Sequence, residues 1–364
     1  MAFATTFHDL LDPLTGDRRS IRVEDGRPLP AGTPTPSGVG RDIDGSDWWV
    51  LPGLYDADAH LPLVELGLRE SDRYAALQGG VTRINVALQW QDIAELDLRE
   101  LVADLTRWSL PEITPILSVH SDSDASGFGP WLAENAELVR ELLPPVCKLY
   151  SYGDGFWDNL RTVADAGLLP VVYCKDAEDL EAVAAKAPVP IHFRHAVSAE
   201  TVEVMERLVG ATLQTSPHFL LPVTDDVRAG LFVLPPVGGD DQREAFAPLV
   251  PDHISYLVTD HNAPPLEAPT GPGLQVIQHF APAVLTIAEL YGWPLPDVWE
   301  MVTTAPARRF GVELADSFVI VDPAHRQTVG LWEPRQTADR APYAGLELTG
   351  RVIAVGNDAV VEIL

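Results

Sequence analysis

Short apolar runs alternate with amphipathic stretches through the middle of the chain. Eight of the apolar runs are nearly continuous and are bounded by turn residues, which is typical of strands buried on both faces of a parallel sheet. In chain order they are DWWVLPG, VTRINVAL, ITPILSVH, VCKLYSY, LPVVYCK, VPIHFRHA, ATLQTSP and ISYLVTDH. Their number and spacing predict eight buried strands.

Apolar residues recur at helical spacing between these runs, within residues 92–108, 131–143, 176–187, 198–210 and 274–292. The last segment is apolar on all sides, which indicates a buried helix rather than a membrane span. Strands that alternate with helices in this way predict an α/β fold, a (β/α)8 TIM barrel.

The two ends of the chain have a different pattern. Residues 15–50 are rich in Gly, Pro and charge, and residues 312–364 alternate strand-like runs with turns. We assign residues 1–50 and 312–364 together to the end segments. We expect these two segments to pair into a small β-sandwich domain beside a barrel domain of residues 51–311.

Composition narrows the class of partner. The net charge of −28, from 25 basic and 53 acidic residues, disfavours nucleic acid and anionic membranes as partners. The expected partner is a small-molecule substrate. With Cys147 and Cys174 as the only cysteines, a disulfide framework is not expected, and a cytoplasmic location is predicted. The N-terminal residues MAFATTFHDLLD show neither a signal peptide nor a membrane anchor.

The segment VLPGLYDADAHLPL, residues 50–63, holds the first candidate chemistry. Asp56, Asp58 and His60 alternate along a strand end, so that their side chains point to the same side. Because active sites of such barrels lie at the carboxyl ends of the strands, this spacing predicts a metal site at the barrel mouth.

Polar side chains also end the later predicted strands. The convergence of carboxylate, imidazole and amine groups from several strands favours a reactive site over packing. These residues are Lys148, Tyr173, Cys174, Lys175, His192, His195, His218, Asp260 and His261. Asp260 and His195 are the foremost catalytic or ligand candidates. His192, three positions before His195, is expected to face the other side and to be structural, and a packing role is favoured for His120.

An ordered series of motifs resembles one protein family along nearly the whole chain. PGLYDADAH resembles a PG-x-x-D-x-H-x-H segment, and HFRHAVS resembles an H-x-x-H-x-x-S segment. Further matches are AALQGGVT, CKLYSY, QTSPHFL, LPPVGG, TDHNAPP, PTGPGLQ, TTAPARRFGV and YAGLELTGRV. The chain resembles the amidohydrolase superfamily, in its dihydroorotase and allantoinase branch of cyclic amidohydrolases.

The resemblance implies a metal site with departures. Asp58 replaces the first histidine of the family's pair, and Tyr173 stands where a strand-5 histidine is expected. The implied site holds one divalent ion, zinc or manganese, with Asp260 also serving as the catalytic base. Its implied ligands are Asp58, His60, a carbamylated Lys148, His195 and Asp260. If Lys148 instead stays an ammonium, it pairs with the carboxylates and the site is satisfied without a metal. The sequence leaves both alternatives open.

The family's contacts to the carboxylate of dihydroorotate are replaced. Their places resemble Pro62, Gln89, Gly238 and Pro264 or Pro265. A buried site that lacks the family's arginine would leave the substrate carboxylate unpaired and would bind it poorly. We therefore expect dihydroorotate not to be the substrate. Weaker substrate contacts are assigned to Tyr173, Gln89 and His261. Lys175 and Arg194 are the nearest candidates to supply a replacement positive charge. The alternative for each is structural: a surface lysine and a salt-bridged arginine.

Two functions follow from these observations. The first is a metal-dependent hydrolase of a cyclic amide or related C–N bond. The second is a non-catalytic dihydroorotase homologue that acts as a structural or regulatory subunit, with an aspartate carbamoyltransferase-like partner, or binds a small molecule. A homodimer is expected because dimers are common among relatives.

Overall fold

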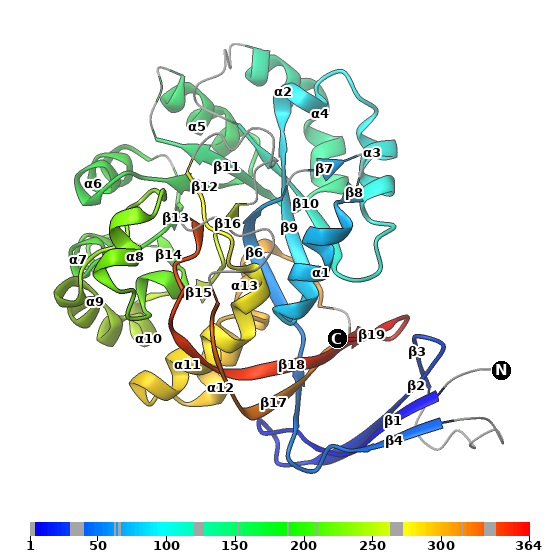
Figure 1. Ribbon diagram of the computed structural model, residues 1–364. Coiled ribbons are helices and arrows are strands. Elements are labelled where there is room, and N and C mark those ends of the chain that lie inside the picture. The colour runs from blue at the N-terminus through cyan, green and yellow to red at the C-terminus, as the bar shows by residue number, and fades with distance from the viewer. Residues whose placement is uncertain are drawn as a thin grey trace.

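The chain folds into a strand barrel surrounded by helices, with a smaller sheet beneath it that joins both ends of the sequence (Figure 1). The computed structural model describes residues 4–29, 40–61, 63–64, 67–119, 127–151, 153, 155–187, 189–208, 210–262, 272–314, 316–330 and 340–364. Within these residues, no helix is both long enough and apolar enough to cross a bilayer.

All strands of the barrel run parallel, in the order β15-β14-β13-β12-β11-β10-β9-β6-β16. Their bounds are β6 (Leu54–His60), β9 (Val81–Gln89), β10 (Glu112–Ser118), β11 (Val146–Tyr150), β12 (Leu169–Tyr173), β13 (His192–Arg194), β14 (Thr212–Thr215), β15 (Tyr256–Leu257) and β16 (His261–Asn262).

The last barrel strand consists of two short pieces that close the sheet. β15 pairs with β14, whereas β16 pairs with β6. Between them, the Val258 amide donates to the Thr215 carbonyl and the Asp260 amide donates to the Asp58 carbonyl, both at 3.0 Å. The chain therefore crosses from one edge of the sheet to the other within a few residues, and the predicted TIM barrel is confirmed.

Helices lie outside this barrel (Figure 1). They are α1 (Glu70–Gln78), α2 (Trp90–Ile93), α3 (Leu98–Leu105), α4 (Phe128–Leu142), α5 (Phe156–Asp165), α6 (Ala177–Lys186), α7 (Ala199–Glu206), α8 (Asp225–Gly230), α9 (Asp240–Phe246), α10 (Val250–His253), α11 (Phe280–Tyr291), α12 (Leu295–Glu300) and α13 (Thr304–Phe310).

Two predicted helices differ from the observed ones. The 92–108 segment splits because Asp97 caps a new helix, accepting hydrogen bonds from the Arg99 and Glu100 amides. The helix expected from residue 274 begins only at Phe280. The preceding residues are tied to the barrel instead, since the amides of Val276 and Ile277 donate to His261 Nδ1.

The small sheet contains strands from both ends of the chain, in the order β19-β18-β17-β5-β1-β2-β3, with β4 paired to β1. Their bounds are β1 (Ala4–Leu11), β2 (Arg18–Glu24), β3 (Arg27–Leu29), β4 (Gly40–Asp44), β5 (Trp49–Pro52), β17 (Ser317–Thr328), β18 (Glu347–Asn357) and β19 (Val361–Ile363). Pairing of the two ends beside the barrel agrees with the predicted fold. The domain boundaries at residues 50 and 312 stay predictions.

The run DWWVLPG was expected as the first barrel strand, and this is wrong. Its residues form β5 of the small sheet, and the barrel begins only after Gly53. A β-carbon at Gly53 would lie 2.3 Å from the Thr82 side chain and 2.8 Å from the Ser317 hydroxyl. Only glycine therefore fits where the chain passes from the sheet into the barrel.

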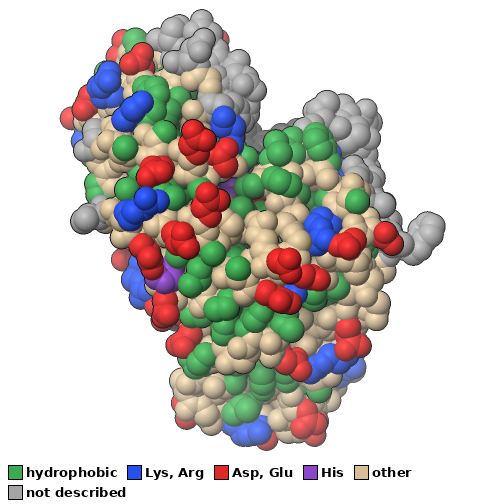
Figure 2. Space-filling view, turned by 90° about the vertical axis from the view of Figure 1, so that its left-hand side faces the viewer, with side chains coloured by type: hydrophobic (Ala, Val, Ile, Leu, Met, Phe, Trp, Pro, Cys, Tyr) green, Lys and Arg blue, Asp and Glu red, His purple; other side chains and the backbone are tan. Residues whose placement is uncertain are grey.

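The surface seen in Figure 2 mixes acidic, basic and apolar side chains. Acidic side chains are scattered over this face rather than gathered in one block. Dispersed carboxylates repel one another less than clustered ones do, so this arrangement limits the repulsion that the excess of acidic residues causes.

Candidate functional site

A cavity of about 450 Å³ opens at the carboxyl ends of the barrel strands. The residues that define its chemistry are His60, Tyr150, Tyr173, Arg194, His195 and Asp260, which come from β6, β11, β12, β13 and the turn before β16. Lys175 and Gln89 also line it. The cavity therefore lies where strand-end chemistry is expected in a barrel of this kind.

Asp58 lies beneath this cavity and accepts hydrogen bonds from three side chains. Lys148 Nζ is 2.6 Å from Oδ1, and Arg194 Nε is 2.6 Å from Oδ2. Arg194 Nη2 lies 3.2 Å from Oδ1, and Gln214 Nε2 donates to Oδ2 at 2.5 Å. A carboxylate has about four lone-pair positions. All the acceptor positions of Asp58 are therefore used by the protein itself.

Arg194 was not predicted to be among the main residues of the site, but the structure places it there. Its side chain is only 2% exposed, as are those of Asp58 and Lys148. Besides binding Asp58, Arg194 Nη2 lies 3.1 Å from His60 Nε2 and 3.8 Å from Asp260 Oδ1. The guanidinium thus lies among the residues predicted to hold a metal, as a salt-bridged arginine inside the site.

The alternation along β13 was the signal that could have found Arg194. Residues two apart on a strand share a side, and His192 and Arg194 are two apart. His192 binds Gln214 Oε1 at 3.1 Å and the Tyr256 hydroxyl at 2.6 Å, and Gln214 donates to Asp58. His192 is therefore structural, as predicted. It supports the site from below rather than facing the other side, and that part of the prediction is wrong.

The prediction that His192 and His195 face opposite sides failed because the strand ends at Arg194, before His195. His195, the next residue, has φ 58°, and Asp260 has φ 52°. Both backbones lie in the left-handed region, which costs non-glycine residues about 1–3 kcal/mol and is concentrated at functional sites. The two strained residues meet at the cavity, with His195 Nε2 3.6 Å from Asp260 Oδ1.

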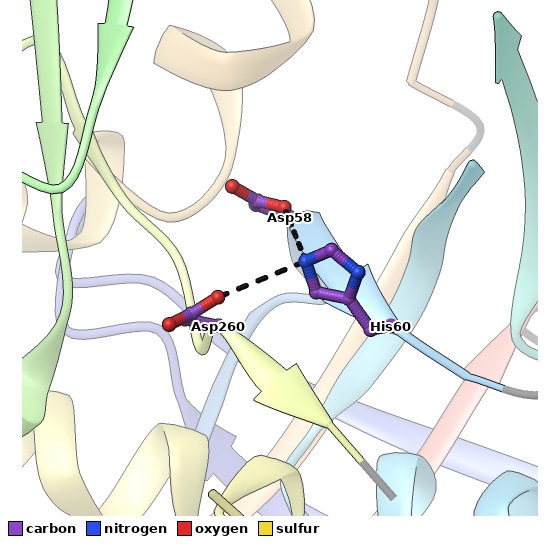
Figure 3. Close-up of side chains that lie close together, drawn as sticks. All are labelled: Asp58, His60 and Asp260. Carbon is purple, nitrogen blue, oxygen red and sulfur yellow. Dashed lines mark ion pairs between the residues drawn. The ribbon is translucent and has the colours of Figure 1, made fainter. Parts of the chain in front are cut away.

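Asp58, His60 and Asp260 form a candidate metal-ligand group, with one ligand atom from each and all of these atoms within 4.8 Å (Figure 3). The imidazole lies between the two carboxylates: His60 Nε2 is 3.7 Å from Asp58 Oδ1 and 3.9 Å from Asp260 Oδ1. The sequence correctly predicted that these three residues would meet.

Their surroundings do not fit a divalent ion in this arrangement. The lone pairs of Asp58 are occupied, and the Nε2 atom of His60 faces the Arg194 guanidinium. Two cationic side chains, Lys148 and Arg194, would also repel an added cation. Of the three candidate ligands, only the Asp260 carboxylate accepts no side-chain hydrogen bond from the described residues. The predicted zinc ion and the carbamate on Lys148 stay predictions.

The two carboxylates differ in proton affinity. Burial raises the pKa of Asp260 to about 8, and the nearby charge of Asp58 adds to this effect against the opposing pull of Arg194. Burial also acts on Asp58, but Arg194 and Lys148 outweigh it and hold the pKa of Asp58 well below its usual range. Near neutral pH, Asp58 is therefore ionised while Asp260 can exchange a proton.

Both histidines at the site are neutral near pH 7. Burial lowers the pKa of His60 well below its usual value, and the charges of Lys148 and Arg194 lower it further. Burial and Arg194 likewise lower the pKa of His195. Neutral imidazoles can accept or donate a hydrogen bond at the cavity wall without adding charge.

Of the three residues predicted as weaker substrate contacts, two line the cavity and one does not. Tyr173 and Gln89 line the cavity, and the Tyr173 ring meets the His195 ring edge-on with centroids 5.9 Å apart. His261 is a correction: it does not line the cavity, because its Nδ1 atom accepts the backbone amides of Val276 and Ile277. His120, Pro62, Pro264 and Pro265 lie outside the described residues.

His218, which follows β14, gives a prediction about acid stability. It is fully buried, and burial lowers its pKa to about 3. The unfolded chain, with a histidine pKa near 6.5, binds a proton first, so stability is complete above about pH 6.5 and is lost as the pH falls toward 3. Between pH 7 and 5, His218→Leu should gain about 2 kcal/mol relative to the unmodified chain. Urea unfolding at both pH values measures this gain; an equal difference at the two would contradict it.

Several solved structures share this fold over nearly the whole chain. A dihydropyrimidinase from Brevibacillus agri NCHU1002 covers 99% of this chain with 95% of its own, at TM-score 0.71 and 16% identity. A D-hydantoinase structure matches at TM-score 0.72 and 16% identity, covering 99% of this chain and 95% of its own.

The L-hydantoinase (dihydropyrimidinase) from Arthrobacter aurescens also matches at TM-score 0.72 and 16% identity, covering 99% of this chain and 97% of its own. No family model matches the sequence, and no curated protein is similar to it in sequence. At this level of identity the likeness shows the fold alone, and it shows that fold over nearly the full length of the chain.

Proposed function

We propose that this chain is a hydrolase that opens a cyclic amide, or cleaves a related C–N bond, in the cavity at the barrel mouth. The observation that carries the proposal is the meeting of His195 and Asp260 at the cavity, each held in a strained left-handed backbone. The solved structures that share the fold are named as hydantoinases and dihydropyrimidinases, whose names describe ring-opening of this kind.

Each residue has a role in the proposed reaction. The oxygen of water attacks the ring carbonyl carbon, the C–N bond breaks, and a proton moves from the water to the leaving nitrogen. Asp260 takes that proton and returns it, for which a pKa of about 8 is well matched to neutral pH. Arg194 lines the cavity and stabilises the negative charge that develops on the carbonyl oxygen. Asp58 holds Arg194 in position, and Lys148 in turn donates to Asp58.

The proposed substrates are neutral five- and six-membered cyclic amides. The sequence places that resemble the dihydroorotase contacts hold Gln89 and Gly238, neither of which supplies a positive charge. The zinc or manganese ion implied by the family resemblance has no step in this mechanism, because the lone pairs of Asp58 and the Nε2 atom of His60 face Lys148 and Arg194.

Turnover of a ring panel tests the proposal. The purified chain is incubated with hydantoin, dihydropyrimidine and dihydroorotate rings, with and without added zinc, and ring-opened products are separated and quantified. We expect opening of at least one neutral ring and none of dihydroorotate. If every ring stays intact under both conditions, the proposal is wrong.

A second candidate is a non-catalytic homologue that acts as a structural or regulatory subunit or binds a small molecule. The observation that favours it is the network on Asp58, which satisfies the buried charges without any reaction. A partner like aspartate carbamoyltransferase belongs to this candidate, whereas homodimer formation is expected under either candidate. Light scattering of the chain alone and mixed with such a partner would show a larger particle if it holds.

A further inference from the structure

We propose that the guanidinium of Arg194 permanently takes the place of the divalent cation in this barrel and keeps metal ions out of the site. The inference goes beyond the proposed function, because it concerns which cation neutralises the buried carboxylate and holds whether or not a ring is opened. It rests on four observations about Arg194 and its neighbours.

The first observation is position. A cation held by Asp58, His60 and Asp260 would lie among their ligand atoms, which are all within 4.8 Å of one another. Arg194 Nη2 already lies 3.2 Å from Asp58, 3.1 Å from His60 and 3.8 Å from Asp260. One guanidinium nitrogen therefore contacts or approaches each of the three residues that a metal would need.

The second observation is occupancy of the ligand atoms. Asp58 accepts from Arg194, Lys148 and Gln214 through both of its oxygens. Coordination of a metal by Asp58 would break at least one of these bonds, and the donor left behind would be buried and unpaired. Buried donors without partners are costly, so the protein arrangement competes with any incoming ion.

The third observation is charge. An arginine stays protonated in proteins at any ordinary pH, so Arg194 is a fixed positive charge inside the barrel. Lys148 adds a second cationic group, 2.6 Å from the same carboxylate. A carbamate on Lys148 would instead place an anion against Asp58, which this spacing does not accommodate without a further cation.

The fourth observation is confinement of the side chain. The Arg194 side chain is 2% exposed, and its Cζ lies 5.6 Å from the centroid of the Tyr150 ring. Its Nε and Nη2 atoms are both bound to Asp58 in a planar fork. To make room for a metal, the guanidinium would have to break its two hydrogen bonds to Asp58 and leave the Tyr150 ring.

Zinc binding to the unmodified chain and to Arg194→Met tests the proposal. Methionine removes the charge and keeps much of the bulk. Arg243→Met serves as the matched control, because Arg243 lies outside the site and binds the Tyr291 hydroxyl. Isothermal titration with zinc chloride, with elemental analysis after dialysis, gives affinity and stoichiometry, and circular dichroism shows whether each variant is folded.

We expect the unmodified chain and Arg243→Met to retain no zinc at this site after dialysis. Arg194→Met should bind one zinc per chain with affinity raised about tenfold or more, and His60→Ala added to it should remove the gain. One zinc per unmodified chain, lost on His60→Ala, would overturn the proposal even if Arg194→Met does not fold. A folded Arg194→Met without the gain would also overturn it. Neither result depends on ring opening, so this proposal and the proposed function can fail separately.

Discussion

Asp260→Asn should lower kcat/KM for ring opening by about 10²- to 10⁴-fold, the usual contribution of a positioned acid–base group. The amide cannot take a proton from water or return it to the leaving nitrogen. The free energy of unfolding should hardly change, because no described side chain donates to this carboxylate and its nearest charged neighbour, Arg194 Nη2, is 3.8 Å away. The same ring-opening assay and urea unfolding supply the two measurements.

A surface carboxylate supplies the control for this variant. Asp226→Asn, on the exposed side of α8, makes the same chemical change away from the cavity and should keep full activity. If Asp260→Asn retains more than about a tenth of the rate, Asp260 is not the group that moves the proton. If it loses activity only because it unfolds, the urea measurement will show that.

The barrel and most of the site were readable from the sequence because both depend on local pattern. Apolar runs of strand length indicate buried strands, and the carboxyl ends of parallel strands meet at one face. That reasoning brought Asp58, His60 and Asp260 together from β6 and the turn before β16, as the structure has them. It failed at DWWVLPG because a run of apolar residues suits a sheet strand and a barrel strand equally well.

Arg194 was harder to predict because its role depends on neighbours far away in the sequence. Its main partner, Asp58, lies 136 residues earlier, and nothing local to HFRHAVS indicates that pairing. Counting alternation back from His195 also misled, since the left-handed backbone at His195 resets which side a residue faces. Lys148 Nζ lies 2.6 Å from Asp58, as the ammonium alternative predicts, and the carbamate alternative stays a prediction.

Asp58→Asn should lower the free energy of unfolding by about 3–5 kcal/mol, the cost of leaving a buried charge without its partner. Lys148 and Arg194, both 2% exposed, would lose the anion that neutralises them, and asparagine keeps the shape but not the charge. This is a large share of the stability of a typical protein, about 5–15 kcal/mol. Urea unfolding followed by tryptophan fluorescence measures it.

An exposed ion pair shows what a charge outside the barrel contributes. Glu141 pairs with Arg99 at 2.6 Å, but both side chains are more than half exposed. Glu141→Gln should therefore lower the free energy of unfolding far less than Asp58→Asn does, because solvent screens an exposed pair. If Asp58→Asn costs as little as Glu141→Gln, the buried network is not what the distances indicate.

A second substitution separates lost charge from lost packing. If the cost of Asp58→Asn is mainly an unpaired guanidinium, then adding Arg194→Met to it should recover part of the stability, because the uncompensated charge is removed with its partner. If the cost is mainly lost packing, the double variant should be less stable than either single one. Recovery in the double variant would show that Asp58 and Arg194 are retained as a pair, each tolerated inside the barrel only because the other is present.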